Sequence, residues 1–306
     1  MLDLCLLSVC RIAMTDLDAI RSVALRHAGR GSPAMPRLHL FRIDTPTDAA
    51  GLIYDPVVCL VLQGTKRTFI GDGALQYGPG ECMVVAAEVT AMGQVCEAST
   101  DEPYLALNLL LDAAVISAVL LEMDRLPEAR IRSGYGVSKA DPRLLEAWRR
   151  FAELLDRPDE VRVMAAHLEH ELMFRLLMGQ QGGLLRQIAG ADSRLSHIRR
   201  AMAWVRQHYA ENLSIGAMAT VAGMSSSVFH RRFKAVTGVS PLQYQKHIRL
   251  HEARRRLVTE RAEAATVGYA VGYESASQFS REYKRLFGAP PRRDADALQP
   301  ASKDGP

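Results

Sequence analysis

One short segment occurs twice in the C-terminal third of the chain, at an offset of 50 residues. Residues 229–241 read FHRRFKAVTGVSP, and residues 279–291 read FSREYKRLFGAPP. Both copies carry an aromatic pair at i and i+4, an arginine, a lysine, a glycine and a proline at the same places. A repeat of this kind predicts that the same small helical unit is built twice.

The residues around each copy predict where its helices begin and end. Gly223 and Gly272 mark a turn ahead of the two copies, and Ser225 and Ser275 follow as candidate N-caps. Each copy ends at a glycine with a proline three residues later, which is typical of one helix ending and the next beginning. A short helix, a turn and a second helix form a helix-turn-helix unit, so the sequence predicts two such units.

Spacing within the second helix of each unit separates packing residues from residues that could reach DNA. Aromatic residues at i and i+4 are predicted to face the core: Phe229 with Phe233, and Phe279 with Tyr283. We assign base reading to polar residues on another face, namely Ser227, His230, Arg231, Ser277, Gln278, Ser280 and Arg281. We assign phosphate contacts to Lys234, Lys284, Arg232 and Arg285.

Two alternatives stay open for these helices. Polar residues on one helix are commonly a solvated face, although serine and arginine at matching places in both copies favour a role in DNA recognition. Gln278 could reach a base, or it could close a capping box back to Ser275.

Charge is divided unevenly along the 306 residues, a length that favours two domains. Residues 193–293 hold 18 Lys and Arg against 6 Asp and Glu, whereas the rest of the chain holds 20 against 28. A basic C-terminal part joined to an acidic N-terminal part favours a polyanion such as double-stranded DNA as the partner of the C-terminal part.

At the repeated segments the chain resembles the AraC-type (AraC/XylS) transcriptional regulators. The strings that carry the resemblance are SPLQYQKHIRL, VGYESASQFSREYKRLFG and APPRRD in the C-terminal half, and IYDPVVCLVLQGTKR, YGPGE and EPYLALNLLLD in the N-terminal half. The resemblance covers roughly residues 36–294. It implies a sequence-specific transcriptional regulator controlled by a small organic effector, which binds in a cupin-like N-terminal domain. RNA polymerase is a further candidate partner. These residues do not distinguish a transcriptional activator from a repressor.

Short apolar runs divided by turn residues between Leu38 and Leu111 predict a β-sandwich or barrel. The expected strands are Leu38–Ile43, Val57–Gln63, Lys66–Ile70, Leu75–Tyr77, Cys82–Ala86, Gly93–Glu97 and Tyr104–Leu111. The resemblance selects the cupin-like barrel. We predict an effector pocket lined by Tyr54, Cys59, Gln63, Tyr77, Cys82 and Cys96. The alternative for each cysteine is a small buried hydrophobic residue, and Cys96 is also a candidate redox or electrophile sensor.

The barrel segment is poor in metal ligands, because no histidine occurs between His39 and His167. Imidazole is the usual nitrogen ligand of transition metals, so we predict no metal, no cofactor and no catalytic residue. A cupin enzyme fused to a DNA-binding tail is the less favoured alternative. An architectural DNA binder without an effector is disfavoured by the long N-terminal half. His167, His170 and Glu171 match neither HExxH nor HxxEH and are predicted to lie on a solvated helix face.

Apolar stripes predict two helices that could form a homodimer within residues 113–183. One stripe comprises Leu144, Leu145, Trp148, Leu154 and Leu155; the other comprises Val161, Met164, Leu168, Leu172 and Leu176. These stripes could equally pack on the barrel, and both roles are compatible.

The expected fold class is α+β, with an N-terminal cupin-like β-barrel, flanking helices and a C-terminal all-α double helix-turn-helix domain. The expected boundaries are a helix and connector at 1–35, the barrel at 36–112, a helical dimerisation segment at 113–183, a linker at 184–192, the DNA-binding domain at 193–294 and a disordered tail at 295–306. Residues 1–13 are apolar but too short to span a bilayer and fit a signal peptide poorly. We expect them to be an overextended reading frame or a frayed turn ahead of Met14 in a cytoplasmic protein that does not enter a membrane.

Overall fold

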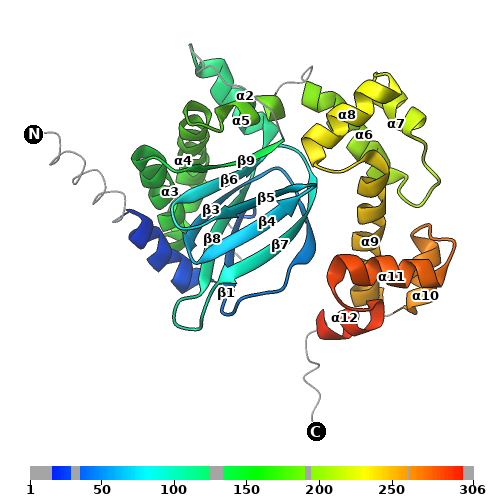
Figure 1. Ribbon diagram of the computed structural model, residues 1–306. Helices are drawn as coiled ribbons and strands as arrows, with labels where there is room; N and C mark the ends of the chain where they lie inside the picture. Colours follow the sequence, from blue (N-terminus) through cyan, green and yellow to red (C-terminus); the bar gives the residue numbers. More distant parts are fainter. Residues whose placement is uncertain (1–15, 29–34, 125–133, 190–193, 261, 299–306) are drawn as a thin grey trace, which may run out of the picture.

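A computed structural model describes residues 16–28, 35–124, 134–189, 194–260 and 262–298. The chain forms an N-terminal domain of two stacked sheets covered by helices, and a C-terminal helical domain that lies against the second sheet (Figure 1). From one side to the other, the layers are helices, sheet A, sheet B and the helical domain. The α+β class predicted from the sequence is confirmed.

Nine antiparallel strands make up the two sheets in the part of the chain that the structure describes. Sheet A has the order β1-β8-β3-β6-β9, with bounds Leu38–Ile43, Tyr104–Leu110, Val57–Gln63, Glu81–Val85 and Tyr135–Lys139. Sheet B has the order β2-β7-β4-β5, with bounds Ala50–Tyr54, Val89–Glu97, Thr65–Ile70 and Gly73–Tyr77. The segments β2 and β9 were not among the expected strands.

The sheets do not close into the expected cupin-like barrel. Among the described strands, β1 pairs only with β8 and β2 pairs only with β7, so both are edge strands. The chain passes from sheet A to sheet B between β1 and β2, and no ladder joins these two neighbouring edges. The N-terminal domain is therefore an open sandwich, and the unpaired edges leave a gap between the sheets.

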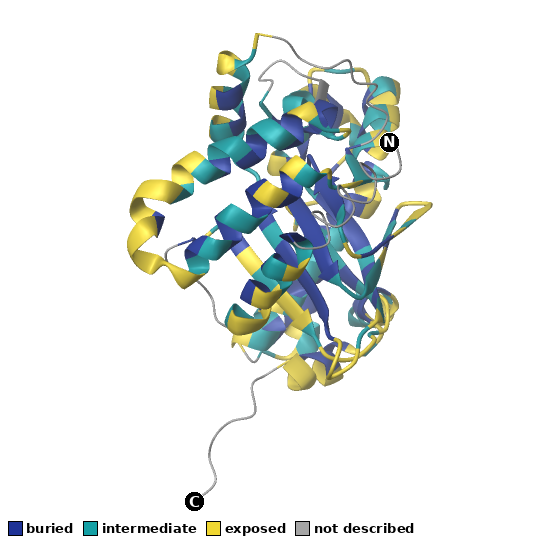
Figure 2. Cartoon of the chain, turned by 90° about the vertical axis from the view of Figure 1, so that its left-hand side faces the viewer, coloured by how far each residue is buried: buried dark blue, intermediate teal, exposed yellow. Residues whose placement is uncertain are grey.

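Strand β3 contributes to two hydrophobic cores, one between sheet A and the helices and one between the two sheets. Its alternate residues Val58, Leu60 and Leu62 pack against the helices, whereas Val57, Cys59 and Val61 pack between the sheets. All six are nearly inaccessible to solvent, so the run VVCLVLQ lacks the polar alternation of a half-exposed strand. Figure 2 shows the resulting buried strands with exposed residues on the outer helices.

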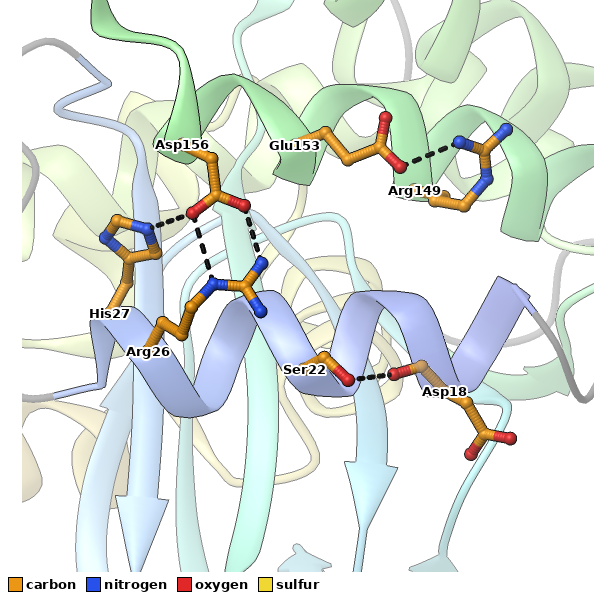
Figure 3. Close-up of polar contacts among 7 residues, drawn as sticks. All are labelled: Asp18, Ser22, Arg26, His27, Arg149, Glu153 and Asp156. Atoms are coloured by element: carbon orange, nitrogen blue, oxygen red, sulfur yellow. Dashed lines mark hydrogen bonds and ion pairs between the residues drawn. The ribbon is translucent and has the colours of Figure 1, made fainter.

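Helices cover the outer face of sheet A. They are residues 16–27, α2 (Ala113–Glu122), α3 (Pro142–Glu153), the short η1 (Leu154–Asp156), α4 (Pro158–Met178) and α5 (Gly182–Ala189). The N-terminal helix is fastened to η1 through Asp156, which accepts hydrogen bonds from Arg26 at 3.3 and 2.6 Å and pairs with His27 at 2.8 Å (Figure 3). Most of the expected linker at 184–192 is helical, because Leu184, Leu185 and Ile188 of α5 are buried in the domain core.

The C-terminal domain contains the two predicted helix-turn-helix units. The first comprises α7 (Ile215–Val221) and α8 (Ser226–Thr237), and the second comprises α10 (Ala264–Ala270) and α11 (Ala276–Phe287). The remaining helices are α6 (Arg194–Gln207), α9 (Pro241–Glu260), which joins the units, and α12 (Pro291–Leu298). Helix α12 continues past the expected domain end at 294, so residues 295–298 do not belong to a disordered tail. Residues 1–15 and 299–306 lie outside the described residues.

Glycine stands at the four positions of the repeat that need a left-handed backbone. Gly223 and Gly272 have φ of 63° and 93° in the two turns. Gly238 and Gly288 have φ of 78° and 81° at the C-caps of α8 and α11. A side chain at such an angle is strained, which explains the same residue type at matching places.

A buried ion pair fastens the last helix to the second unit. The Arg254 guanidinium donates to both oxygens of Asp294, at 2.8 and 2.9 Å, and the Tyr283 hydroxyl donates to the same carboxylate at 2.7 Å. Asp294 is 7% exposed, so loss of its charge would leave two polar groups short of a partner.

We therefore predict that Asp294→Asn destabilises the C-terminal domain by about 3 kcal/mol, the low end for a broken buried pair because Arg254 keeps some contact with water. Urea unfolding measures this loss. Asp296→Asn is the matched control, since Asp296 is exposed on the same helix. Equal stability of the two variants would contradict the role given to Asp294.

Candidate DNA-binding surface and effector cavity

The two second helices, α8 and α11, turn the same faces inward and outward. Their aromatic pairs are fully buried: Phe229 with Phe233, and Phe279 with Tyr283. Ser227 and Arg231 are exposed on α8, with His230 partly exposed beside them. On α11, Ser277, Gln278 and Arg281 are exposed and Ser280 is partly exposed. The structure thus brings the predicted base-reading residues to the surface of two equivalent helices.

Helix capping differs between the two copies. The Ser275 hydroxyl accepts from the Gln278 backbone N–H at 3.4 Å, whereas Ser225 occupies the N-cap position of α8 without a capping hydrogen bond from its side chain. The Gln278 side chain donates to Glu282 at 3.4 Å instead of closing a capping box on Ser275. This arrangement leaves Gln278 on the exposed face of α11.

The predicted phosphate contacts have unequal surroundings. Lys234 is paired with Asp72, in the β4–β5 turn of the N-terminal domain, at 3.1 Å. Lys284 and Arg285 are exposed on α11, and neither side chain makes a hydrogen bond or ion pair with the residues that the structure describes. Arg232 is partly exposed, and its guanidinium lies 3.9 Å from the Met224 sulfur.

Sheet B and the C-terminal domain meet in a polar cluster around Glu88, whose side chain is 12% exposed. The Glu88 carboxylate accepts from the Tyr244 hydroxyl and pairs with Arg206, which also lies 3.6 Å from Asp55. The Thr90 hydroxyl of β7 is 2.8 Å from Nδ1 of His247 on α9. We call these contacts, from Asp55, Glu88 and Thr90 to Arg206, Tyr244 and His247, the interdomain contact.

Burial controls the titration of the groups at the interdomain contact. Burial raises the pKa of Glu88 above its usual range, although the Tyr244 hydroxyl and Arg206 oppose the shift. Burial, with Lys246 and Arg285 nearby, lowers the pKa of His247 to about 4, and Glu282 opposes this shift. Burial lowers the pKa of His251, one turn further along α9, to about 3. Both histidines are therefore neutral at pH 7.

A cavity of about 300 Å³ lies between the two sheets at their open edge. It is lined by residues of β1, β2, β4 and β8, by Val57 at the start of β3 and by Asp55 between β2 and β3. The full set is His39, Phe41, Ile43, Leu52, Ile53, Tyr54, Asp55, Val57, Lys66, Tyr104, Ala106, Asn108 and Leu110. The cavity is the candidate effector site, because apolar residues and a few polar groups converge on it.

The structure separates the six residues predicted for the effector pocket. Tyr54 lines the cavity, and Cys59 belongs to the core between the sheets without lining it. The Tyr77 hydroxyl is 3.1 Å from Thr68 in that core, and Gln63 donates to the Pro103 carbonyl at 2.9 Å.

The three cysteines of the prediction have different environments. Cys82 faces the helices on the opposite side of sheet A, so it cannot line this cavity. Burial raises the pKa of the Cys82 thiol, and it raises the pKa of the Cys59 thiol to about 11. Both are neutral thiols at pH 7, which disfavours them as reactive sensors. Cys96 is half-buried, with its sulfur 3.9 Å from the Gln94 carbonyl oxygen.

Five polar residues of the cavity were missed by the sequence prediction: His39, Asp55, Lys66, Tyr104 and Asn108. A signal for two of them lies in the segment YLALNLL of β8, where Tyr104 and Asn108 occupy alternate positions on the inner face. A polar residue in the middle of a buried apolar strand calls for a partner, and Asn108 is such a residue.

The histidines of α4 have protein partners. His170 lies 3.1 Å from Glu122, and the Glu171 carboxylate accepts from Arg150 at 2.5 and 2.6 Å. His167 is exposed, as predicted for a solvated face. Across the described ranges, no group of three His, Cys, Asp or Glu side chains is placed to hold a metal ion.

Two family comparisons agree with this architecture. Residues 34–184 match the family described as AraC-type transcriptional regulator N-terminus, and residues 218–296 match a helix-turn-helix domain family. The chain belongs to the AraC-type transcriptional regulators. The resemblance seen in the sequence is thereby confirmed for both halves of this AraC-type chain.

Curated relatives share part of the chain. HTH-type transcriptional activator RhaS of Escherichia coli O1:K1 / APEC is 26% identical over 151 residues, which are 49% of this chain and 53% of the relative. RhaS of Pectobacterium atrosepticum is 28% identical over 106 residues, or 35% of this chain and 38% of the relative. The chain thus spans about half the length of the first of these relatives.

Solved structures share the fold over most of the chain. ToxT from Vibrio cholerae strain SCE256 with a bound unsaturated fatty acid has a TM-score of 0.58 at 10% identity, covering 88% of this chain and 96% of ToxT. Another ToxT structure has a TM-score of 0.59 at 11% identity, covering 86% and 98%. At these identities the likeness concerns the fold alone. Among the described helices, none is long and apolar enough to cross a membrane.

The lowered pKa of His247 predicts that acid weakens the folded protein. The stabilising contribution of neutral His247 is complete above about pH 6.5 and is lost as the pH falls from 6.5 towards 4. At pH 5 the loss is about 2 kcal/mol relative to pH 7. The free energy of unfolding of His247→Gln should therefore fall by about 2 kcal/mol less than that of the parent protein between pH 7 and pH 5. Urea unfolding at the two pH values measures this difference.

His167→Gln is the matched control for this experiment, because His167 is exposed and lies outside the interdomain contact. The same pH dependence in His247→Gln and His167→Gln would contradict the assignment.

Proposed function

We propose that this chain is a sequence-specific DNA-binding transcriptional regulator whose operator affinity depends on a small organic effector in the N-terminal cavity. The observation that carries the proposal is the matched pair Arg231 and Arg281. Both are exposed at equivalent positions of α8 and α11, and neither guanidinium makes a hydrogen bond or ion pair within the described part of the chain. The AraC-type family and the basic C-terminal domain support it.

Helix α9 sets the distance between the two reading helices. Its 20 residues span about 30 Å at ~1.5 Å per residue. Successive major grooves on one side of a duplex are roughly 34 Å apart. One chain can therefore present α8 and α11 to adjacent grooves of one operator.

Base reading and phosphate contact fall to different residues of these helices. The forked guanidinium of Arg231 or Arg281 suits the paired acceptors of guanine, with serines and Gln278 beside it. Lys234, Lys284, Arg232 and Arg285 provide charges for phosphate oxygens. Lys234 must leave Asp72 before it can contact DNA, so the first unit depends on the N-terminal domain more than the second.

The N-terminal domain supports a role in sensing. Its cavity is formed largely by apolar side chains, and ToxT, whose fold is similar, is recorded with a bound unsaturated fatty acid. The cavity residue Asp55 lies 3.6 Å from Arg206 of the C-terminal domain, so a ligand could influence the interdomain contact. In this proposal the chain is a cytoplasmic regulator and no enzyme.

We further propose a homodimer through the outer faces of α2 and α4. The two predicted apolar stripes lie largely in the domain core, which contains Leu144, Leu145 and Trp148 of α3 and Val161, Leu172 and Leu176 of α4. The dimer is therefore proposed through exposed residues, of which Met164 alone belongs to a predicted stripe. On α4, Val163 is 65% exposed and Met164 is 37% exposed, and Leu121 at the end of α2 is 89% exposed. Exposed apolar side chains of this size on neighbouring helices are suited to a partner subunit.

For DNA binding we predict that Arg231→Ala or Arg281→Ala costs roughly 1–3 kcal/mol on the operator and relaxes base preference in its own half. Lys284→Ala should weaken binding to all sequences alike and reduce the salt slope by about one. Lys234→Ala should cost less than Lys284→Ala, because loss of Lys234 also removes its pairing with Asp72. Fluorescence anisotropy titrations at several salt concentrations measure these effects.

If an arginine variant keeps its full base preference while a lysine variant loses it, the division between base-reading and phosphate-contacting residues is wrong.

For assembly we predict a dimer at micromolar concentration that Val163→Glu converts to a monomer, because the change puts a charge into an apolar contact. Light scattering measures the mass. Leu242→Glu is the matched control, since Leu242 is 46% exposed but lies on α9. A monomeric parent protein, or dissociation by Leu242→Glu alone, would count against the dimer through α2 and α4.

A further inference from the structure

Lys66 is a cation in the wall of the effector cavity without an anionic partner. Its ammonium group lies 5.4 Å from the centre of the Tyr54 ring, and it makes no ion pair with any residue that the structure describes. Burial alone would lower the pKa of Lys66, but the neighbouring Tyr54 and Cys59 outweigh it and the pKa is raised. Burial raises the pKa of the Cys59 thiol to about 11, so Cys59 supplies no negative charge to Lys66 at neutral pH. The ammonium charge is therefore present and uncompensated.

Three further polar groups of the cavity lack close hydrogen-bond partners. The hydroxyl groups of Tyr54 and Tyr104 and the side-chain oxygen of Asn108 are buried without a close hydrogen-bond partner among the described residues. The Lys66 ammonium is the polar neighbour of the Tyr54 hydroxyl, and the Cys59 thiol is that of the Tyr104 hydroxyl, but neither lies close enough for a well-formed hydrogen bond. The side chains of Tyr54 and Tyr104 are 7% and 2% exposed. Buried polar atoms are nearly always paired, so several unpaired atoms around one cavity indicate a bound molecule that supplies the partners.

Local structure places Lys66 over this space. Lys66 pairs with Val95 across β4 and β7, next to Gly93. A Cβ at Gly93 would lie 2.6 Å from Leu52 Cδ2 and 3.4 Å from Lys66 Cε. The absence of a side chain at Gly93 therefore gives Leu52 and the Lys66 stem room to lie along the inner face of sheet B.

The one carboxylate in the cavity wall does not neutralise Lys66. Asp55 is 60% exposed and lies 3.6 Å from Arg206, on the side of the C-terminal domain. The rest of the wall is mainly aliphatic and aromatic, including Phe41, Leu52 and Leu110. Such a wall disfavours a strongly hydrated ligand, and a single cation favours a single negative charge.

We propose that the cavity binds an apolar molecule with one carboxylate group. The carboxylate pairs with Lys66 and accepts hydrogen bonds from the hydroxyl groups of Tyr54 and Tyr104, while the apolar body lies against Phe41, Leu52 and Leu110. This inference rests on the proposed function, because it names the chemical class of the effector. A protonated Lys66 is a poor nucleophile, so the binding is noncovalent.

The test compares a carboxylate with its neutral counterpart on the purified full chain. Decanoate and decanamide share the same apolar chain, and isothermal titration calorimetry without DNA gives both affinities. We expect decanoate to bind at least tenfold more tightly than decanamide. Lys66→Met should remove this preference by weakening decanoate about tenfold or more, whereas Lys66→Arg should keep most of it.

Two more variants complete the design. Lys139→Met is the matched control, because Lys139 is exposed on the edge strand β9, and it should bind decanoate like the parent protein. Tyr104→Phe keeps the ring and removes only the hydroxyl, so it should weaken decanoate about threefold or more even if Lys66→Met fails to fold.

The proposal is overturned if decanoate fails to bind, if decanamide binds as tightly as decanoate, or if Lys66→Met and Tyr104→Phe bind decanoate like the parent protein. The proposed function is tested separately by titration of operator DNA in the absence of decanoate. Loss of DNA binding would overturn the regulator, whereas loss of decanoate binding alone would overturn only the ligand class.

Discussion

The two domains depend on each other through the Glu88 carboxylate. Glu88 directly precedes β7, and its carboxylate pairs with Arg206 from α6 and accepts a hydrogen bond from Tyr244 of α9. Removing water from a carboxylate is costly unless charged and hydroxyl donors replace it, so this group ties sheet B to the helices that carry both helix-turn-helix units. On the other side of the same sheet lies the cavity with Lys66. Among the described residues, sheet B thus separates the candidate effector cavity from the C-terminal domain, and the cavity residue Asp55 lies 3.6 Å from Arg206 of that domain.

Much of the C-terminal domain could be predicted from local sequence. The glycines Gly223, Gly272, Gly238 and Gly288 report a left-handed backbone directly, and the aromatic pairs at i and i+4 report the buried face of each helix. These signals act over a few residues, so no tertiary information was needed. Strands β1 and β3 were predicted with the same bounds for the same reason, since the alternating LHLFRI of β1 and the apolar run VVCLVLQ of β3 are local signals.

Features that depend on contacts between distant segments could not be predicted from the local sequence. Strand β2 (AGLIY) is short, and whether it closes a barrel depends on its pairing with β7 rather than on its own residues. Cys82 was placed in the pocket because its strand was recognised but its side of the sheet was not. Lys66 becomes conspicuous only once two sheets enclose it, and the pairing of Asp72 with Lys234 joins residues 162 positions apart.

The most direct measurement is the operator Kd with and without decanoate, in the parent protein and in Glu88→Gln. If the interdomain contact connects the cavity to DNA binding, decanoate changes the Kd of the parent protein by about fivefold or more, the usual lower bound for coupled sites. Glu88→Gln should then bring the ratio of the two Kd values close to one while decanoate still binds. An undiminished ratio in Glu88→Gln would contradict coupling through this contact.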